Sequence, residues 1–108
     1  MKATTRDVND IAIIKVDGKI TIGAGDQQLR DVIAGASSNK ILLDLSGVTT
    51  IDSSGIGELV GSYTTVTNRG GKLKLLHLPA KLNELLHVTQ LITVFEVYEN
   101  EQDALKSY

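Results

Sequence analysis

The feature that most constrains the fold is one segment in which a buried strand passes through a short polar turn directly into a helix. The run Ile41–Leu45, which is apolar except for Asp44, predicts the strand. Helical spacing of the apolar residues then begins, at Ile56, Leu59, Val60, Tyr63 and Val66. The polar residues Asp52, Ser53 and Ser54 are therefore expected at the start of a helix over 55–69.

Polar side chains at a helix start have two interpretations. Their carboxylate or hydroxyl oxygens can accept hydrogen bonds from the unpaired amides of the first turn and simply cap the helix. The positive end of the helix dipole also favours an anion, so the same position can receive a phosphate. The residues alone leave both interpretations open.

The elements on either side predict a single domain of strands and helices. Two strands over 2–8 and 11–17 are expected to meet through a tight turn at Asn9-Asp10. A first helix is indicated by apolar residues at helical spacing, Leu29, Val32, Ile33 and Ala36. The strand over 41–46, the helix over 55–69 and a strand over 72–77 follow. This strand–helix–strand order predicts a parallel pair joined by a right-handed crossover.

The last third of the chain adds two helices and a strand. A short helix is expected near 79–88, a strand over 93–98, and a terminal helix capped by Asn100 and docked through Ala104 and Leu105. The predicted fold class is α/β, with a mixed β-sheet of four to five strands and about four helices. All of residues 1–108 are assigned to this one domain.

A resemblance sharpens the interpretation of the turn. The run Asp52-Ser53-Ser54-Gly55-Ile56-Gly57 follows a Leu-Asp-Leu-Ser strand and opens an amphipathic helix that ends at Gly70-Gly71. This arrangement resembles the signature of the STAS domain family, specifically the bacterial anti-sigma factor antagonists, and the order of predicted elements agrees over residues 5–107. The resemblance implies that the serine directly after the aspartate, Ser53, is phosphorylated by a partner anti-sigma factor that is also a serine kinase.

The implied function is that of an anti-anti-sigma factor. Unphosphorylated, such a protein binds the anti-sigma factor and so releases the sigma factor for transcription; phosphorylation of Ser53 would switch it off. The expected partners are the anti-sigma factor serine kinase and a serine phosphatase. The switch loop that meets the partner is expected to comprise Asp52, Ser53, Ser54, Gly55, Ile56, Gly57 and Glu58.

The sequence departs from the family pattern over Gly18–Gly25. Many of these antagonists carry acidic residues in this region, which helps to contact the kinase, whereas this chain has Gly-Lys-Ile-Thr-Ile-Gly-Ala-Gly. Two other roles therefore stay open. The chain could serve as a STAS module of another phosphorylation-controlled signalling assembly or as a sensor of a nucleotide or other small ligand, or it could be a structural interaction domain in which Ser53 is only a cap.

Composition argues against several classes of partner. The net charge of -2 leaves no basic stripe to neutralise a nucleic-acid backbone, so direct nucleic-acid binding is not expected. No apolar run approaches the roughly 20 residues needed to span a bilayer, and the N-terminus lacks the apolar core of a signal peptide. The expected location is cytoplasmic, without a membrane partner.

The sequence contains no motif for a metal, a cofactor or catalysis. There is no cysteine, and His77 and His87 stand at no recognised ligand spacing, so both are expected to be structural. A dinucleotide fingerprint beginning at Gly55 would need glycine at Val60, and a Walker lysine is absent. Ser53 lacks both the Gly-x-Ser-x-Gly context of a nucleophile elbow and a placed base. The chain is therefore predicted not to be an enzyme.

Overall fold

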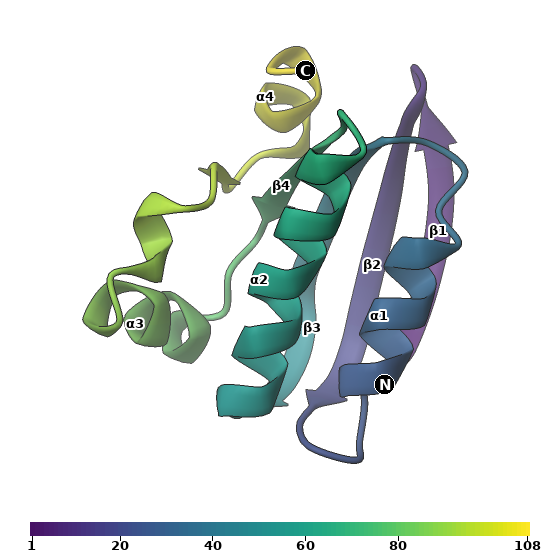
Figure 1. Ribbon diagram of the computed structural model, residues 1–108. Coiled ribbons are helices and arrows are strands. Elements are labelled where there is room, and N and C mark those ends of the chain that lie inside the picture. Colours follow the sequence, from purple (N-terminus) through teal and green to yellow (C-terminus); the bar gives the residue numbers. More distant parts are fainter.

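Five strands form one mixed sheet, and helices pack on it from both faces (Figure 1). The computed structural model describes residues 1–108. The elements in chain order are β1 (Lys2–Val8), β2 (Ile11–Ile20), α1 (Asp26–Ala34), β3 (Lys40–Ile51), α2 (Ser53–Asn68), β4 (Lys72–Leu76), α3 (Ala80–Val88), the 3₁₀ turn η1 (Leu91–Thr93), β5 (Val97–Tyr98) and α4 (Glu101–Lys106). The predicted fold class is confirmed.

The strand order is β1-β2-β3-β4-β5, so every strand lies beside its neighbour in sequence. Only the first pair is antiparallel, and its turn places both Asn9 and Asp10 at positive φ, 51° and 67°. These angles belong to the type I′ hairpin turn, whose twist matches that of the strands. The pairs that follow are parallel, including β3 with β4, as the strand–helix–strand order predicts.

Alternation along the strands divides the core into two layers. Ile14, Leu43 and Leu75 point toward α1, α2 and α3 and belong to the larger buried cluster. Ile13 and Leu42 point to the other face, where they pack against Ala104 of α4. The sequence pattern left open which face each helix covers, and the structure places α4 alone opposite the other three.

The segment 93–98 is the clearest difference from the predicted elements. Its β-branched residues indicate a strand, yet only Val97 and Tyr98 pair with β4. The amide groups of Thr93 and Val94 donate instead to the carbonyls of Gln90 and Leu91, which builds a 3₁₀ turn and removes those donors from the sheet. The predicted strand is therefore wrong over its first part.

Other boundaries shift by a few residues. Strand β2 continues to Ile20 and β3 continues to Ile51, so both are longer than predicted. Helix α1 ends at Ala34, and Ala36 lies beyond it. The apolar spacing therefore predicted a longer helix than the structure contains. At the C-terminal end, the Asn100 side chain accepts from the amide of Asp103 and caps α4 as predicted. None of the helices combines the length and the apolar character that a membrane crossing requires.

Candidate functional site

The start of α2 lies at the end of the long strand β3, where Asp52 is the capping residue. Its backbone is extended, and its carboxylate oxygen Oδ1 accepts from the amide of Gly55 at 3.0 Å. Of the two interpretations of the polar turn, capping is therefore carried out by the carboxylate and by neither hydroxyl. Ser53 is exposed and forms no side-chain hydrogen bond within the chain.

The Asp52 carboxylate has a second task. Its oxygen Oδ2 accepts from the amide of Ile22 at 3.1 Å, which fastens the loop between β2 and α1 against the start of α2. The amides of Gly55 and Ile22, in that order, hold the pKa of Asp52 below its ordinary value of 3.8. Asp52 is therefore a charged carboxylate at neutral pH.

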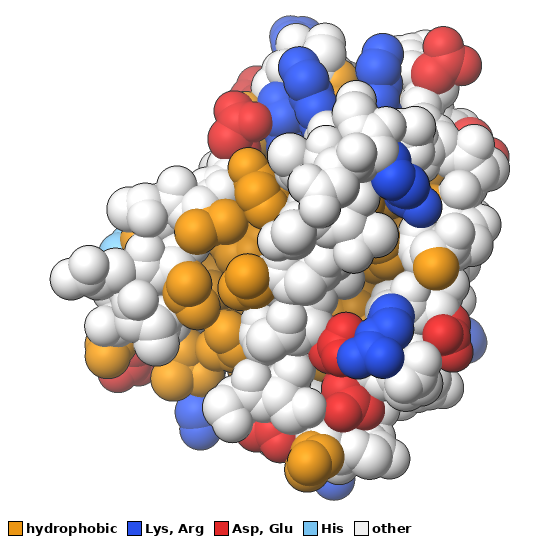
Figure 2. Space-filling view, viewed as in Figure 1, with side chains coloured by type: hydrophobic (Ala, Val, Ile, Leu, Met, Phe, Trp, Pro, Cys, Tyr) orange, Lys and Arg blue, Asp and Glu red, His pale blue; other side chains and the backbone are white.

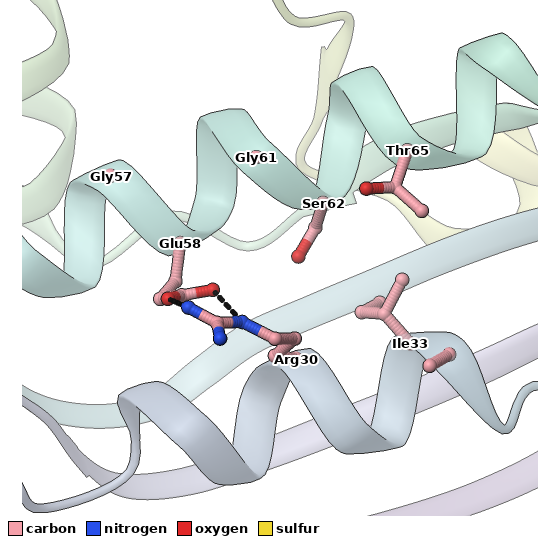
Figure 3. Close-up of a pocket in the computed structure, with 8 residues that line it drawn as sticks. Arg30, Ile33, Gly57, Glu58, Gly61, Ser62 and Thr65 are labelled. Atoms are coloured by element: carbon pink, nitrogen blue, oxygen red, sulfur yellow. Dashed lines mark hydrogen bonds and ion pairs between the residues drawn. The ribbon is translucent and has the colours of Figure 1, made fainter.

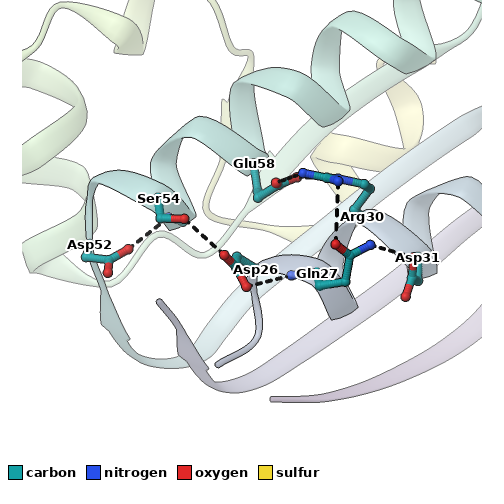
Figure 4. Close-up of polar contacts among 8 residues, drawn as sticks. Asp26, Gln27, Arg30, Asp31, Asp52, Ser54 and Glu58 are labelled. Atoms are coloured by element: carbon teal, nitrogen blue, oxygen red, sulfur yellow. Dashed lines mark hydrogen bonds and ion pairs between the residues drawn. The ribbon is translucent and has the colours of Figure 1, made fainter. Parts of the chain in front are cut away.

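Ser54 is tied to the neighbouring helix (Figure 4). Its hydroxyl donates to Oδ2 of Asp26, the first residue of α1, at 3.0 Å. The amide of Gln27 and, after it, this hydroxyl hold the pKa of Asp26 below its ordinary value of 3.8. The two serines of the turn thus differ: one is engaged in a hydrogen bond between the helices and the other, Ser53, is free.

One turn further along α2, Glu58 forms an ion pair with Arg30 of α1 (Figure 4). The Glu58 side chain is only 16% exposed. The two helices are therefore joined by a hydrogen bond at their starts and by an ion pair one turn later. Glu58 is paired directly with Arg30, whereas the carboxylates of Asp26 and Asp52 are held by hydrogen-bond donors.

Glycine at position 55 is required by the packing of α2 on the sheet. A Cβ there would lie 2.1 Å from the backbone oxygen of Ile20. Gly57 differs, since a Cβ at that position meets nothing within 4 Å. Of these two glycines, only Gly55 is required for the close approach of α2 to the sheet.

Ile56 opens an apolar strip along α2. Figure 2 shows hydrophobic side chains gathered between α2 and α3, where Ile56, Val60 and Tyr63 are half-buried. The tip of the fastened loop is apolar as well, since Ile22 is 78% exposed. The free hydroxyl of Ser53 thus lies between the charged side chain of Asp52 and the apolar side chains of Ile22 and Ile56.

The residues expected to hold no ligand have structural positions. His87 Nδ1 lies 2.7 Å from the carbonyl oxygen of Asn83 within α3. His77 follows β4 with a positive φ of 56°, and its amide donates to Tyr98. No group of three or more potential metal-ligating side chains occurs in the structure.

Sequence reasoning missed Asp26 and Arg30, which order the switch loop from α1. Each contacts a residue 28 positions further along the chain, so no local spacing links them to the turn. The only local signal was an acidic residue at the first position of a helix, where carboxylates are common for electrostatic reasons.

The STAS domain family model matches residues 2–104. The chain belongs to the STAS domain family. This STAS domain is 26% identical over 98 residues to the anti-sigma F factor antagonist of Paenibacillus polymyxa, an alignment that covers 88% of this chain and 84% of that protein. Such relatives are regulators rather than enzymes, which agrees with the prediction for this chain.

Solved structures share the fold of this STAS domain. TM1081 of Thermotoga maritima, a candidate anti-sigma factor antagonist, has a TM-score of 0.88 at 24% identity, covering 97% of this chain and 92% of that one. SpoIIAA, a Bacillus cell fate determinant solved in its phosphorylated form, has a TM-score of 0.72 at 17% identity, covering 98% of each chain. At these identities the likeness concerns the fold.

Proposed function

We propose that this STAS domain is an anti-sigma factor antagonist switched by phosphorylation of Ser53. Unphosphorylated, it binds an anti-sigma factor that is also a serine kinase and thereby releases a sigma factor; phosphorylated, it no longer binds. A serine phosphatase would reverse the switch. This role belongs in the cytoplasm, where transcription takes place.

The observation that carries the proposal is the difference between the two serines. Ser53 is exposed and its hydroxyl has no partner within the chain, so a kinase can approach it without breaking a contact. Ser54 is partly buried and its hydroxyl is engaged with Asp26. The solved phosphorylated form of SpoIIAA is a precedent for modification within this fold.

The switch works through charge at a surface that meets a partner. A phosphate adds about -1.5 to -2 charges directly beside Asp52, which is already ionised and turned toward its own helix. A partner surface shaped for a small neutral hydroxyl then meets added bulk and like-charge repulsion. The contacts of Asp52 with Gly55 and Ile22 do not involve Ser53, so the fold is expected to remain unchanged.

The departure at Gly18–Gly25 bears on the choice of partner. This segment includes the loop that Asp52 fastens, and it presents the exposed Ile22 beside the switch loop. A partner that covers Ser53 would therefore contact an apolar side chain here, where many related antagonists present acidic ones. The partner is expected to offer an apolar surface opposite Ile22.

Phosphorylation is tested by incubating the purified protein with ATP and magnesium, with and without each anti-sigma-type serine kinase encoded in the same genome. Mass spectrometry should find phosphate on Ser53 only when the cognate kinase is present. Label without any kinase would contradict the non-enzymatic role. Label on Ser54 or a threonine, with none on Ser53, would place the switch at another hydroxyl.

A further inference from the structure

A groove of about 270 Å³ runs between α1 and α2 (Figure 3). The ion pair of Arg30 with Glu58 closes the end nearest the switch loop, and Ile33 of α1 contributes an apolar wall. On the α2 side the groove is lined by Gly57, Gly61 and Ser62. Neither glycine is required by a close contact within the chain, and the Ser62 side chain forms no hydrogen bond within it.

The two glycines are unexplained by the chain itself. Glycine inside a helix is unfavourable relative to alanine, because the unfolded chain gains freedom and no side chain is available to pack. A Cβ at Gly57 or Gly61 would meet nothing within 4 Å, and neither residue has a positive φ. Gly55 in the same helix is different, since the sheet requires it. An occupant from outside the chain would explain why positions 57 and 61 carry no side chain.

Ser62 supplies an independent indication. Its residue is only 5% exposed, yet its hydroxyl forms no hydrogen bond within the chain and points into the groove (Figure 3). Every side-chain oxygen that is wholly shielded from solvent has a partner in this structure, so the Ser62 hydroxyl retains access to the groove. Water in the groove can satisfy this hydroxyl in the free protein, and a polar group of a bound partner would take the place of that water.

The groove is continuous with the switch loop. Ser53, Gly57 and Gly61 are spaced four residues apart in α2 and therefore lie along one side of the helix. A partner that covers Ser53 and continues along α2 must pass over both glycines. Small residues at such a position allow the backbones of two helices to approach closely.

We infer that the groove between α1 and α2 seats a helix of the anti-sigma factor, packed directly against Gly57 and Gly61 and hydrogen-bonded to Ser62. This inference rests on the proposed function and specifies its binding surface. The partner helix would lie across the opening of the groove on the side of α2, with one or two of its side chains entering the groove and a small or polar residue opposite Ser62. Phosphorylation at Ser53 would then repel the partner at one end of the surface on which this helix lies.

The test uses the kinase that phosphorylates Ser53, with ADP present so that no phosphate is transferred. Its affinity is measured by calorimetry for the parent protein, Gly61→Leu, Ser62→Ala and the control Gln28→Leu. Gln28 is an exposed residue of α1 that does not line the groove, so Gln28→Leu places an exposed leucine outside the groove. Gly61→Leu should weaken binding at least about tenfold by steric exclusion, and Ser62→Ala about three- to tenfold by loss of one hydrogen bond.

The folded state is monitored in parallel. Because neither substitution removes a contact within the chain, thermal midpoints should not fall below that of the parent. Gly61→Ala provides a milder variant should leucine perturb the helix, and hydrogen exchange of the parent should show the amides around Gly61 protected by the kinase.

Four other outcomes would contradict the inference, and each has a different meaning. Parent-like affinity of Gly61→Leu and Ser62→Ala would exclude the groove while leaving the proposed function intact. Equal weakening by Gln28→Leu would show an effect unrelated to the groove. A changed oligomeric state of Gly61→Leu with unchanged kinase affinity would assign the groove to a second copy of this chain. No binding or labelling of the parent by any such kinase would remove the proposed function, and this inference with it.

Discussion

At the scale of single residues, three adjacent polar side chains have three different tasks. Asp52 caps α2 and fastens the loop at Ile22, Ser54 joins α2 to α1 through Asp26, and Ser53 has no contact of its own. Substitution of Asp52 or Ser54 therefore removes a contact within the chain, whereas substitution of Ser53 removes none. The effects on stability and on partner binding can thus be measured separately. Under the proposed function, Ser53 is the position at which we expect a modification to perturb recognition and to leave the fold in place.

The capping assignment predicts different stabilities for two alanine variants. Asp52→Ala should lower the free energy of unfolding by about 0.5 to 2 kcal/mol, because the amide of Gly55 loses its acceptor. Ser53→Ala should change it by less than about 0.5 kcal/mol, as expected for an exposed residue without a contact. Urea unfolding measures both. A larger loss for Ser53→Ala than for Asp52→Ala would mean that the serine is the structural cap.

The switch predicts an asymmetry in binding at Ser53. Ser53→Asp places a permanent charge beside Asp52 and should weaken kinase binding by about 2 to 5 kcal/mol, because the charge is forced into an interface without a partner. Ser53→Ala should bind nearly as well as the parent. Calorimetry with the purified kinase measures these affinities.

A matched control for the charge is Ser46→Asp. Ser46 is exposed, and it alternates in register with Leu42, so it lies on the face of the sheet opposite α2. This variant should retain parent affinity. If the folded Ser53→Ala and Ser53→Asp variants bind the kinase equally well, the hypothesis of an electrostatic switch at Ser53 is wrong.

At the scale of elements, α2 has a different requirement at each of its glycines. Gly55→Ala should destabilise the protein, because the added Cβ would lie 2.1 Å from the carbonyl oxygen of Ile20 and force α2 away from the sheet. Gly57→Ala and Gly61→Ala should each stabilise it by about 0.5 to 1 kcal/mol, the usual gain for alanine over glycine inside a helix.

Urea unfolding of the three variants compares positions within one helix under identical conditions. Destabilisation at position 57 or 61 would show that these glycines are required by the fold. The inference about the α1–α2 groove would then lose the argument drawn from them. Destabilisation at position 55 alone would separate the glycine that the sheet requires from the two that it does not.

At the scale of the whole molecule, the C-terminal residues close the second face of the sheet. Lys74 of β4 is buried, and its Nζ donates to the backbone oxygen and hydroxyl of Ser107 at 2.8 and 2.9 Å. The Tyr108 hydroxyl donates to the carbonyl oxygen of Ile41, and its ring lies 4.7 Å from the Lys74 ammonium. The last turn of the chain is thereby held against strands β3 and β4.

These contacts of Tyr108 predict that the free energy of unfolding depends on pH. Burial raises the pKa of Tyr108 above its ordinary value of 10.0, so the folded state favours the neutral phenol. The corresponding stability is present below pH 10 and is lost as the pH rises toward the folded pKa, because the unfolded chain releases its proton first. Tyr108→Phe should cost about 0.5 to 1.5 kcal/mol at neutral pH through the lost hydrogen bond.

The variant also provides the test. Urea unfolding at neutral pH and near pH 11 should show a smaller loss of stability for Tyr108→Phe than for the parent, since phenylalanine cannot ionise. Identical losses in the two proteins would mean that Tyr108 ionises as freely in the folded as in the unfolded chain.

Local pattern determined most of the elements and the position of the switch loop. The change from a short, largely apolar run to helical spacing at Ile56 predicted that a strand is followed by a helix here, because strands and helices impose different periods on buried residues, although β3 continues to Ile51 and α2 already begins at Ser53. Asn9-Asp10 and Asn100 specified a turn and a cap through their own chemistry. The resemblance of the turn to STAS domains then pointed to Ser53.

Other features of the protein depend on contacts between segments that are distant in the sequence, and these could not be predicted from local pattern. Thr93 and Val94 have strand propensity, yet their amides donate to the carbonyls of Gln90 and Leu91 in a 3₁₀ turn and not to β4. Which serine is free, which residues of α1 order the loop and whether a helix glycine is needed all depend on contacts between segments about thirty residues apart. Sequence periodicity reports which face of an element is buried, whereas these contacts depend on how two elements are placed relative to each other, and only the folded chain sets that placement.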